Sequence, residues 1–223
     1  MSPVDANVTA AIVGVLLAGG LSRRMGGGDK GLLGLDRKTM LAHVIERAAP
    51  QAACLVINAN GDPARFSAYG LPVVPDTVEG YPGPLAGVLA GMRWAESHRP
   101  EARYVLTVST DAPFLPADLG QRLFVAAEAQ PGAIALARSG GHLHPVIGLW
   151  PVRHADDLEA AVRDEGVRKV LAWTERHGVV PVDFSPVSIG GEAVDPFYNA
   201  NTPEELSEAR RLLIEAEAHR RAE

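Results

Sequence analysis

The chain has 223 residues, of which 47% are hydrophobic, 22% charged and 5% aromatic, and its formal net charge is −6. A chain of this length buries roughly 70–75% of its extended surface, which is enough for one large domain. The acidic balance and the scarcity of aromatic side chains argue against nucleic acid as a partner, because such proteins carry a basic excess or aromatic stacking platforms.

The single cysteine and the apolar runs indicate the cellular setting. Cys54 lies within an apolar stretch and has no second cysteine to pair with, so we expect a small buried core residue in a reducing compartment. No run reaches the ~18–20 apolar residues of a membrane span. No basic residue precedes the first apolar stretch, as a signal peptide would require, so the expected location is the cytoplasm, away from membranes.

The first half of the chain predicts alternating strands and helices. Thr39 is placed to cap the first of these helices, and Pro50 to close it. The pattern predicts a mostly parallel sheet with helices on both faces, which binds ligands at the carboxyl ends of its strands. Strands are expected at 11–18, 54–58, 72–75 and 104–109, and helices at 40–49, after Asp62-Pro63, at 85–97 and at 117–129.

The second half is less regular. The segments 133–137 and 145–150 flank Ser139-Gly140-Gly141-His142 and predict an antiparallel hairpin. Thr202-Pro203-Glu204-Glu205 predicts the start of the last helix, with Thr202 as the cap and Glu205 completing a capping box. Between them we expect helices at 154–163 and 167–177 and strands at 179–183 and 193–199.

The loop Gly19–Lys30 carries the strongest chemical signal. Its glycines let the backbone approach phosphate oxygens closely, while Arg24 and Lys30 add positive charge. A P-loop is excluded because Asp29, not glycine, precedes the lysine. An NAD site is disfavoured because the second strand ends in Asn58 instead of an acidic residue. The alternative interpretation is a basic surface loop without a ligand.

Asp111 follows the apolar strand expected at 104–109 and places a carboxylate at the ligand edge of the sheet. Mg²⁺ that bridges phosphates uses one or two carboxylates and several waters. The segment alone is equally consistent with an aspartate that caps a turn before Pro113. The glycine-rich loop at the same edge favours the metal.

Three further segments place polar or stiff groups near that edge. Asp76 closes the third strand, and the stiff run 81–87 after it suits recognition of a base by backbone groups, although a plain loop-to-helix turn is the alternative. Asn199 and Asn201 precede the last helix. Two roles are open to their side chains: contact with a ligand or metal, or capping of the helix. The residues alone favour capping.

Taken in order, these motifs closely resemble the molybdenum cofactor guanylyltransferases, the MobA family, over about residues 12–213. The Gly-Gly after Leu17-Ala18 is similar to the guanylyl enzymes, whereas cytidylyl relatives tend to have Ala-Gly there. The motifs that carry the resemblance are Leu17-Ala18-Gly19-Gly20 through Lys30, Tyr81-Pro82-Gly83-Pro84-Leu85-Ala86-Gly87, Asp111, and Asn199-Ala200-Asn201-Thr202-Pro203-Glu204-Glu205-Leu206.

The resemblance implies an α/β three-layer sandwich with a mostly parallel sheet, a Rossmann-like nucleotidyltransferase fold of the GT-A type. It implies one domain, with a nucleotide-binding half at about 12–110 and an acceptor-binding half at about 111–213. The implied reaction moves GMP from GTP to the terminal phosphate of the molybdopterin cofactor, with Mg²⁺, or Mn²⁺ in its place, and releases pyrophosphate. The implied protein partners are the proteins that insert molybdenum in the preceding step of cofactor synthesis, and the molybdoenzymes that accept the cofactor or their chaperones.

The resemblance also implies roles for individual positions. Catalysis depends on Lys30, Arg24 and Asp111, with Asp111 holding the metal. Ala112 departs from the threonine that usually follows this aspartate, which removes a hydroxyl but not the carboxylate. The implied ligand-binding residues are Leu17, Ala18, Gly19, Gly20, Lys30, Asn58, Asp76, Gly83, Leu85 and Asp111 for GTP, and Arg24, His144, Asn199 and Asn201 for the acceptor.

Two other functions fit the same residues. One is a different nucleotidyltransferase that uses CTP or UTP, such as a cytidylyltransferase or a sugar- or alcohol-phosphate enzyme. The other is a nucleotide-binding regulator without catalysis. A mere sensor needs no paired neutralising groups at the reacting phosphate, so Lys30 and Asp111 together weigh against it.

Overall fold

A seven-stranded sheet, in the order β5-β4-β1-β6-β8-β7-β9, forms the centre of the molecule. The computed structural model describes residues 3–19, 29–78, 80 and 83–222. Every pairing in the sheet is parallel except those of β8, which runs antiparallel to both of its neighbours. The strands are β1 (Ile12–Leu17), β4 (Cys54–Asn58), β5 (Val73–Val74), β6 (Tyr104–Ser109), β7 (Ile134–Ser139), β8 (His142–Pro151) and β9 (Val179–Asp183).

The strands form where apolar runs can be covered on both faces. All six residues of β1 are buried, as expected for a central parallel strand. Its last residue, Leu17, is in register with Asn58 at the end of β4 and with Ser109 at the end of β6. The carboxyl ends of three neighbouring strands therefore lie level, and the residues that follow them meet at one edge.

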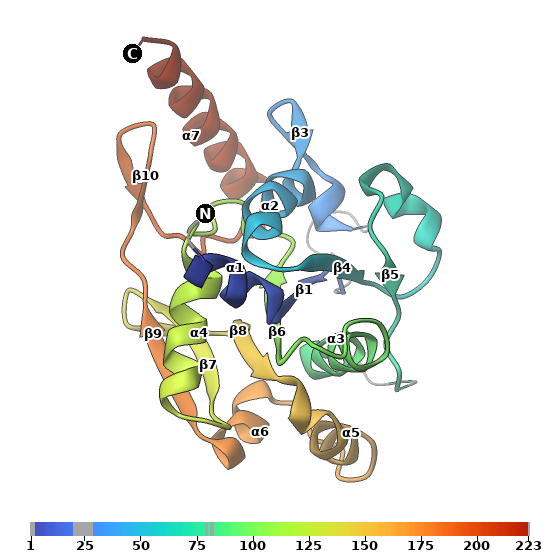
Figure 1. Cartoon of the computed structure of the whole chain (residues 1–223). Helices are drawn as coiled ribbons and strands as arrows, with labels where there is room; N and C mark the ends of the chain where they lie inside the picture. The colour runs from blue at the N-terminus through green and yellow to red at the C-terminus, as the bar shows by residue number, and fades with distance from the viewer. Residues whose placement is uncertain (1–2, 20–28, 79, 81–82, 223) are drawn as a thin grey trace.

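Helices cover both faces of the sheet and complete three layers (Figure 1). The apolar stripe of each helix packs on one of two cores that alternate residues of the strands fill. One face is covered by α1 (Pro3–Ala10), α2 (Met40–Ala48) and α4 (Leu119–Ala129). The other face is covered by α3 (Pro84–His98), α5 (Ala155–Arg163) and α6 (Val170–His177). The expected three-layer, mostly parallel α/β fold is confirmed.

A third, smaller core joins the last helix to the body. The helix α7 (Pro203–Ala222) extends away from the sheet beside the hairpin of β10 (Val187–Ile189) and β11 (Glu192–Val194) (Figure 1). Leu206 and Leu212 of α7 pack with Met40 and Phe114 from the body. The remaining elements are the hairpin β2 (Gly34–Leu35) and β3 (Lys38–Thr39), and the 3₁₀ helices Lys30–Leu32, Ala49–Gln51, Pro63–Tyr69 and Val152–His154.

Most local predictions are confirmed, with boundaries shifted by one to three residues. The Thr39 side chain accepts a hydrogen bond from the backbone N–H of Ala42, so it caps α2 as expected. The β7–β8 hairpin forms as well, and its turn residues Gly140 and Gly141 have φ angles of 52° and 81°. Positive φ at both central residues is the turn geometry that matches the twist of a two-stranded hairpin.

The strand expected at 193–199 is wrong beyond Val194. The chain turns there because the Asp195 carboxylate accepts the backbone N–H of Phe197, and the carbonyl of Asp195 accepts that of Tyr198. Such local side-chain bonds compete with a β ladder. The sequence did not predict α1, β10 or the β2–β3 hairpin, whose turn holds Asp36 at a φ of 58°.

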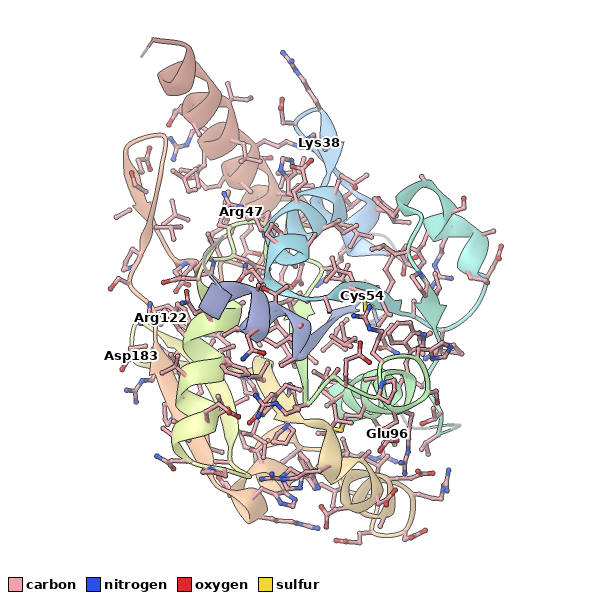
Figure 2. The ribbon with its side chains drawn as sticks, viewed as in Figure 1. Lys38, Arg47, Cys54, Glu96, Arg122 and Asp183 are labelled. Atoms are coloured by element: carbon pink, nitrogen blue, oxygen red, sulfur yellow. The ribbon has the colours of Figure 1, made fainter. Side chains whose placement is uncertain are left out.

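Cys54 lies at the start of β4 (Figure 2) and is only partly buried, whereas the sequence predicted a buried core residue. Burial raises the pKa of its thiol, which disfavours the thiolate form that reacts. Among the helices that the structure describes, none has both the length and the apolar character needed to cross a bilayer.

Candidate nucleotidyltransferase site

Polar side chains follow the level carboxyl ends of the central strands. Asn58 ends β4, Asp76 follows β5 by two residues, and Asp111 follows β6 by two residues. Because β8 is antiparallel to β6, the start of β8, which carries His144, lies at the same edge. The fold therefore gathers the predicted residues of both halves of the chain along one side of the sheet.

A basic and an acidic side chain meet at the middle of this edge. The Lys30 ammonium lies 3.9 Å from Oδ2 of Asp111 and donates a hydrogen bond of 2.6 Å to Oδ1 of Asn201. The exposed fractions of the Lys30 and Asp111 side chains are 26% and 15%, so both charges are partly shielded yet open to a ligand. Three predicted residues from distant parts of the chain thus form one cluster.

Neighbouring groups hold Asp111 in place. The Ser109 hydroxyl donates to Oδ1 of Asp111. The backbone carbonyl of Asp111 accepts the backbone N–H of Ala200 at 3.2 Å. Within the described part of the chain, the Asp111 carboxylate accepts no backbone N–H, and the residue that precedes α4 is Asp118. The alternative of a turn-capping aspartate therefore has no support in the geometry.

Asn58 and Asp76 form a second, adjacent cluster. The Asn58 side chain is 4% exposed and donates to the carbonyl of Val74 at 3.1 Å and to Oδ1 of Asp76 at 3.0 Å. Asn60 bonds Asp76 twice. Its side-chain N–H donates to Oδ2 of Asp76 at 2.7 Å, and its Oδ1 accepts the backbone N–H of Asp76 at 2.9 Å. The Asp76 carboxylate is thereby fixed as an acceptor of known orientation.

The first turn of α3 packs against this cluster. Gly83 precedes the helix, Pro84 takes the first position and Leu85 is fully buried. A Cβ atom on Gly87 would lie 2.3 Å from Oδ1 of Asn58 and 2.7 Å from a methyl of Leu17. The helix can approach the two strand ends this closely only because position 87 has no side chain.

The capping interpretation of the two asparagines before α7 is wrong. Thr202 caps α7 through a 3.2 Å bond from the N–H of Glu205, whose carboxylate accepts the N–H groups of Asn201 and Thr202. The Asn201 amide is thus available to Lys30. Oδ1 of Asn199 is buried without a partner among the described residues, so it can accept a bond from a ligand or metal.

His144 is half-buried and its ring packs on Phe197 at a centroid distance of 4.7 Å. Its Nε2 lies 2.7 Å from the Ser139 hydroxyl. Burial lowers the pKa of His144. The nearby Asp195 carboxylate raises the pKa, but by less than burial lowers it. The imidazole is therefore neutral near pH 7 and serves as a hydrogen-bonding group, not as a fixed cation.

Some predicted residues contribute backbone or lie outside the described residues. The N–H of Ala18 donates to the carbonyl of Asn58 at 2.9 Å, while Gly19 is exposed. Gly20 and Arg24 lie outside the part of the chain that the structure describes, as do Tyr81 and Pro82. The structure therefore leaves the predicted roles of Gly20 and Arg24 as predictions.

Sequence reasoning missed several residues that support the site. Asn60 and Ser109 orient the two acidic residues, and Arg65 holds Asp29, the neighbour of Lys30, through a 2.5 Å ion pair. The only available signal was their position within two residues of a predicted site residue, and Arg65 lacks even that. Such contacts depend on how loops after different strands meet.

In residues 3–19, 29–78, 80 and 83–222, no group of three or more His, Cys, Asp or Glu side chains is placed to enclose a metal ion. An ion held by the Asp111 carboxylate would have its other coordination positions open to a substrate and water. That is the usual arrangement for Mg²⁺ in phosphate chemistry, where one or two carboxylates suffice.

Comparison with known proteins identifies the family. The family model of the MobA-like NTP transferase domain matches residues 14–179. Proteins named molybdenum cofactor guanylyltransferase are similar: that of Bradyrhizobium sp. (strain ORS 278) is 56% identical, covering 94% of this chain and 96% of its own, and that of Rhodopseudomonas palustris (strain BisB5) is 50% identical, covering 96% and 98%.

The fold recurs in solved structures. The crystal structure of molybdopterin-guanine dinucleotide biosynthesis protein A from Archaeoglobus fulgidus superposes with a TM-score of 0.69 at 23% identity, covering 90% of this chain and 97% of that one. The sheet order, the matched domain and the relatives that align along nearly the whole length agree with one another. The chain belongs to the MobA-like NTP transferase family, and it is an enzyme of the nucleotidyltransferase class.

Proposed function

We propose that the chain transfers GMP from GTP to the terminal phosphate of molybdenum-molybdopterin, forming the guanine dinucleotide cofactor and releasing pyrophosphate. The observation that carries the proposal is the Lys30–Asp111–Asn201 cluster, which lies between the Asn58–Asp76 cluster and the half of the edge that holds His144. Relatives that are 56% and 50% identical along nearly the whole chain bear the name of this activity.

The chemistry needs charge neutralisation and alignment more than proton transfer. The acceptor's terminal phosphate oxygen attacks the α-phosphorus of GTP, the bond to the β-phosphate bridging oxygen breaks, and pyrophosphate leaves with the electron pair. A phosphate monoester is already ionised near pH 7, so no general base is required. Lys30 neutralises charge on the reacting phosphates, and the clusters on either side align the two substrates.

Mg²⁺, or Mn²⁺ in its place, is the expected metal. The residues at Asp111 fit a hard cation, because they offer a partly buried carboxylate and, in Asn199, a buried amide oxygen without a partner among the described residues. When bound, such an ion withdraws charge from phosphoryl oxygens. Asp111 would hold it, and Ser109 and the N–H of Ala200 keep Asp111 oriented.

The nucleotide occupies the half of the domain at about residues 12–110, and the acceptor the half at about 111–213. The base site is expected to consist largely of backbone groups of Leu17–Gly19 and Tyr81–Leu85, of which Tyr81 and Pro82 lie outside the described residues, with the bonded Asn58 and Asp76 side chains nearby. The first test mixes the protein with GTP, Mg²⁺ and molybdopterin and measures pyrophosphate release. Release with GTP supports the proposal; binding without release would indicate a regulator instead.

GTP is expected to bind at least about tenfold more tightly than CTP, because a site built from backbone groups and fixed side chains rejects a base that leaves them unpaired. Isothermal titration of the same preparation with GTP, CTP and UTP, each with Mg²⁺, measures the difference. Equal or tighter binding of CTP would assign the chain to cytidylyl transfer.

Gly87→Ala is expected to weaken GTP binding by about tenfold, the cost of about one hydrogen bond. The added methyl would lie 2.3 Å from Oδ1 of Asn58, so the Asn58 amide must move away from Asp76. Gly34→Ala is the matched control, because a Cβ at position 34 has no atom within 4 Å. If titration shows parental GTP affinity for Gly87→Ala, the Asn58–Asp76 cluster does not bind the nucleotide.

A further inference from the structure

Ser139 lies at the centre of a hydrogen-bonded group on the acceptor side of the sheet edge. It ends β7, is 4% exposed, and its hydroxyl oxygen lies 2.7 Å from Nε2 of His144 on the paired strand β8. The same hydroxyl oxygen lies 2.9 Å from Oδ1 and 2.8 Å from Oδ2 of Asp195. One serine thus joins the strand that carries His144 to the segment that leads to Asn199 and Asn201.

The chemistry of the three groups decides where the protons lie. A carboxylate only accepts hydrogen bonds, and a serine hydroxyl has a single proton to donate. The Ser139 proton therefore points to Asp195, and the Ser139 oxygen must accept the bond from His144. The neutral His144 ring consequently carries its proton on Nε2 and leaves Nδ1 as a bare acceptor.

The arrangement is held rigidly. Asp195 also accepts the N–H of Phe197 at 2.8 Å, and the buried Phe197 ring packs against the His144 ring. Asp195 and His142 are the charged or titratable groups that act on His144, with opposite effects on its pKa. Nδ1 of His144 has no hydrogen-bond partner among the described residues, so it is free for a ligand.

We propose that Ser139, backed by Asp195, is a positioning residue that holds His144 with a bare Nδ1, and that this Nδ1 accepts a hydrogen bond from an N–H of the acceptor's pterin ring. The inference rests on the proposed function, which supplies a pterin as acceptor. A bare ring nitrogen selects N–H donors and repels phosphate oxygens, so His144 binds the heterocycle of the acceptor and not its phosphate. Along the edge formed by the strand ends, Asn58 lies at β4, Asp111 follows β6, and His144 lies on the next strand, β8.

The first experiment reads the His144 tautomer directly in the free protein. Two-bond ¹H–¹⁵N spectra of histidine-labelled protein, with the His144 signals assigned by their loss in His144→Gln, distinguish Nε2–H from Nδ1–H rings. We expect Nε2–H in the parent and a mixture of tautomers in Ser139→Ala. An Nδ1–H ring in the parent overturns the proposal, and this result does not depend on any transfer activity.

The second experiment measures the kinetics of pyrophosphate release at saturating GTP and Mg²⁺. Loss of one neutral hydrogen bond is expected to raise the KM for molybdopterin about tenfold in Ser139→Ala, with kcat and the KM for GTP unchanged. Ser139→Thr, which keeps the hydroxyl, should restore the KM. Ser97→Ala is the control, because Ser97 is an exposed serine whose hydroxyl bonds only the carbonyl of Arg93 within the described residues.

Each outcome decides one question. If Ser139→Ala keeps the parental KM for molybdopterin, or if the KM values for both substrates rise together, Ser139 has only a structural role and the proposal fails. If the parent releases no pyrophosphate with GTP and molybdopterin, the proposed function fails. The tautomer spectra then still decide whether Ser139 positions His144.

Discussion

Asp111→Asn is expected to lower kcat for pyrophosphate release by about 10²–10³ while leaving the fold intact. The substitution keeps the shape of the side chain and its bond from the Ser109 hydroxyl, but it removes the negative charge that binds a hard cation. It also removes the charge that Lys30 faces at 3.9 Å. A Mg²⁺ titration of initial rates should show half-saturation moved to higher Mg²⁺ concentration in the variant.

The matched control for this variant is Asp118→Asn, since Asp118 precedes α4 on the surface and its carboxylate pairs with Arg122. The melting temperature of Asp111→Asn without ligand should stay within about 2 °C of the parent's, because Asn replaces Asp at equal volume. Turnover of Asp111→Asn close to the parent's at every Mg²⁺ concentration would make the metal assignment untenable.

Lys30→Ala is expected to lose about 10²–10³ in turnover, the scale of removing one preorganised electrostatic contact from a reacting group. In the described structure the Lys30 ammonium contacts Asn201 and Asp111, and both partners remain accessible to water when it is removed. Stability should therefore change little. Single-turnover measurements with saturating GTP separate slower transfer from weaker binding.

Lys38→Ala is the matched control for Lys30→Ala. Lys38 lies on the β2–β3 hairpin (Figure 2), its side chain is half exposed, and it pairs with Glu46. Loss of this surface pair should leave turnover and stability nearly unchanged. If folded Lys30→Ala turns over like the Lys38→Ala control, Lys30 does not act on the reacting phosphates.

Much of the first half of the chain was predictable because its signals are local. The apolar strands β1, β4 and β6 read as buried parallel strands, and parallel strands bring their carboxyl ends together. Asn58, Asp76 and Asp111 follow directly from that rule. The helix cap at Thr39 and the capping box at Thr202 also depend on residues within four positions of each other.

The second half of the chain was predicted less well because its contacts join distant segments. By sequence alone the two asparagines before α7 favoured capping, yet Asn201 bonds Lys30, which is 171 residues away. Ser139 gave no signal beyond its place in a hairpin turn, and its role arises only where Asp195 and His144 converge on it. The strand expected at 193–199 is interrupted by a local turn at Asp195.

The sequence by itself determined the layers of the fold, the edge of the sheet at which its polar residues gather, and the residue types available there, because hydrophobic period and capping act over a few residues. Only the tertiary structure decided which of those residues meet, since that depends on strand order, on the antiparallel direction of β8 and on the packing of α7 against Met40 and Phe114. A hydrogen bond needs its atoms within about 3 Å, and placing distant segments that closely is the work of the packed core.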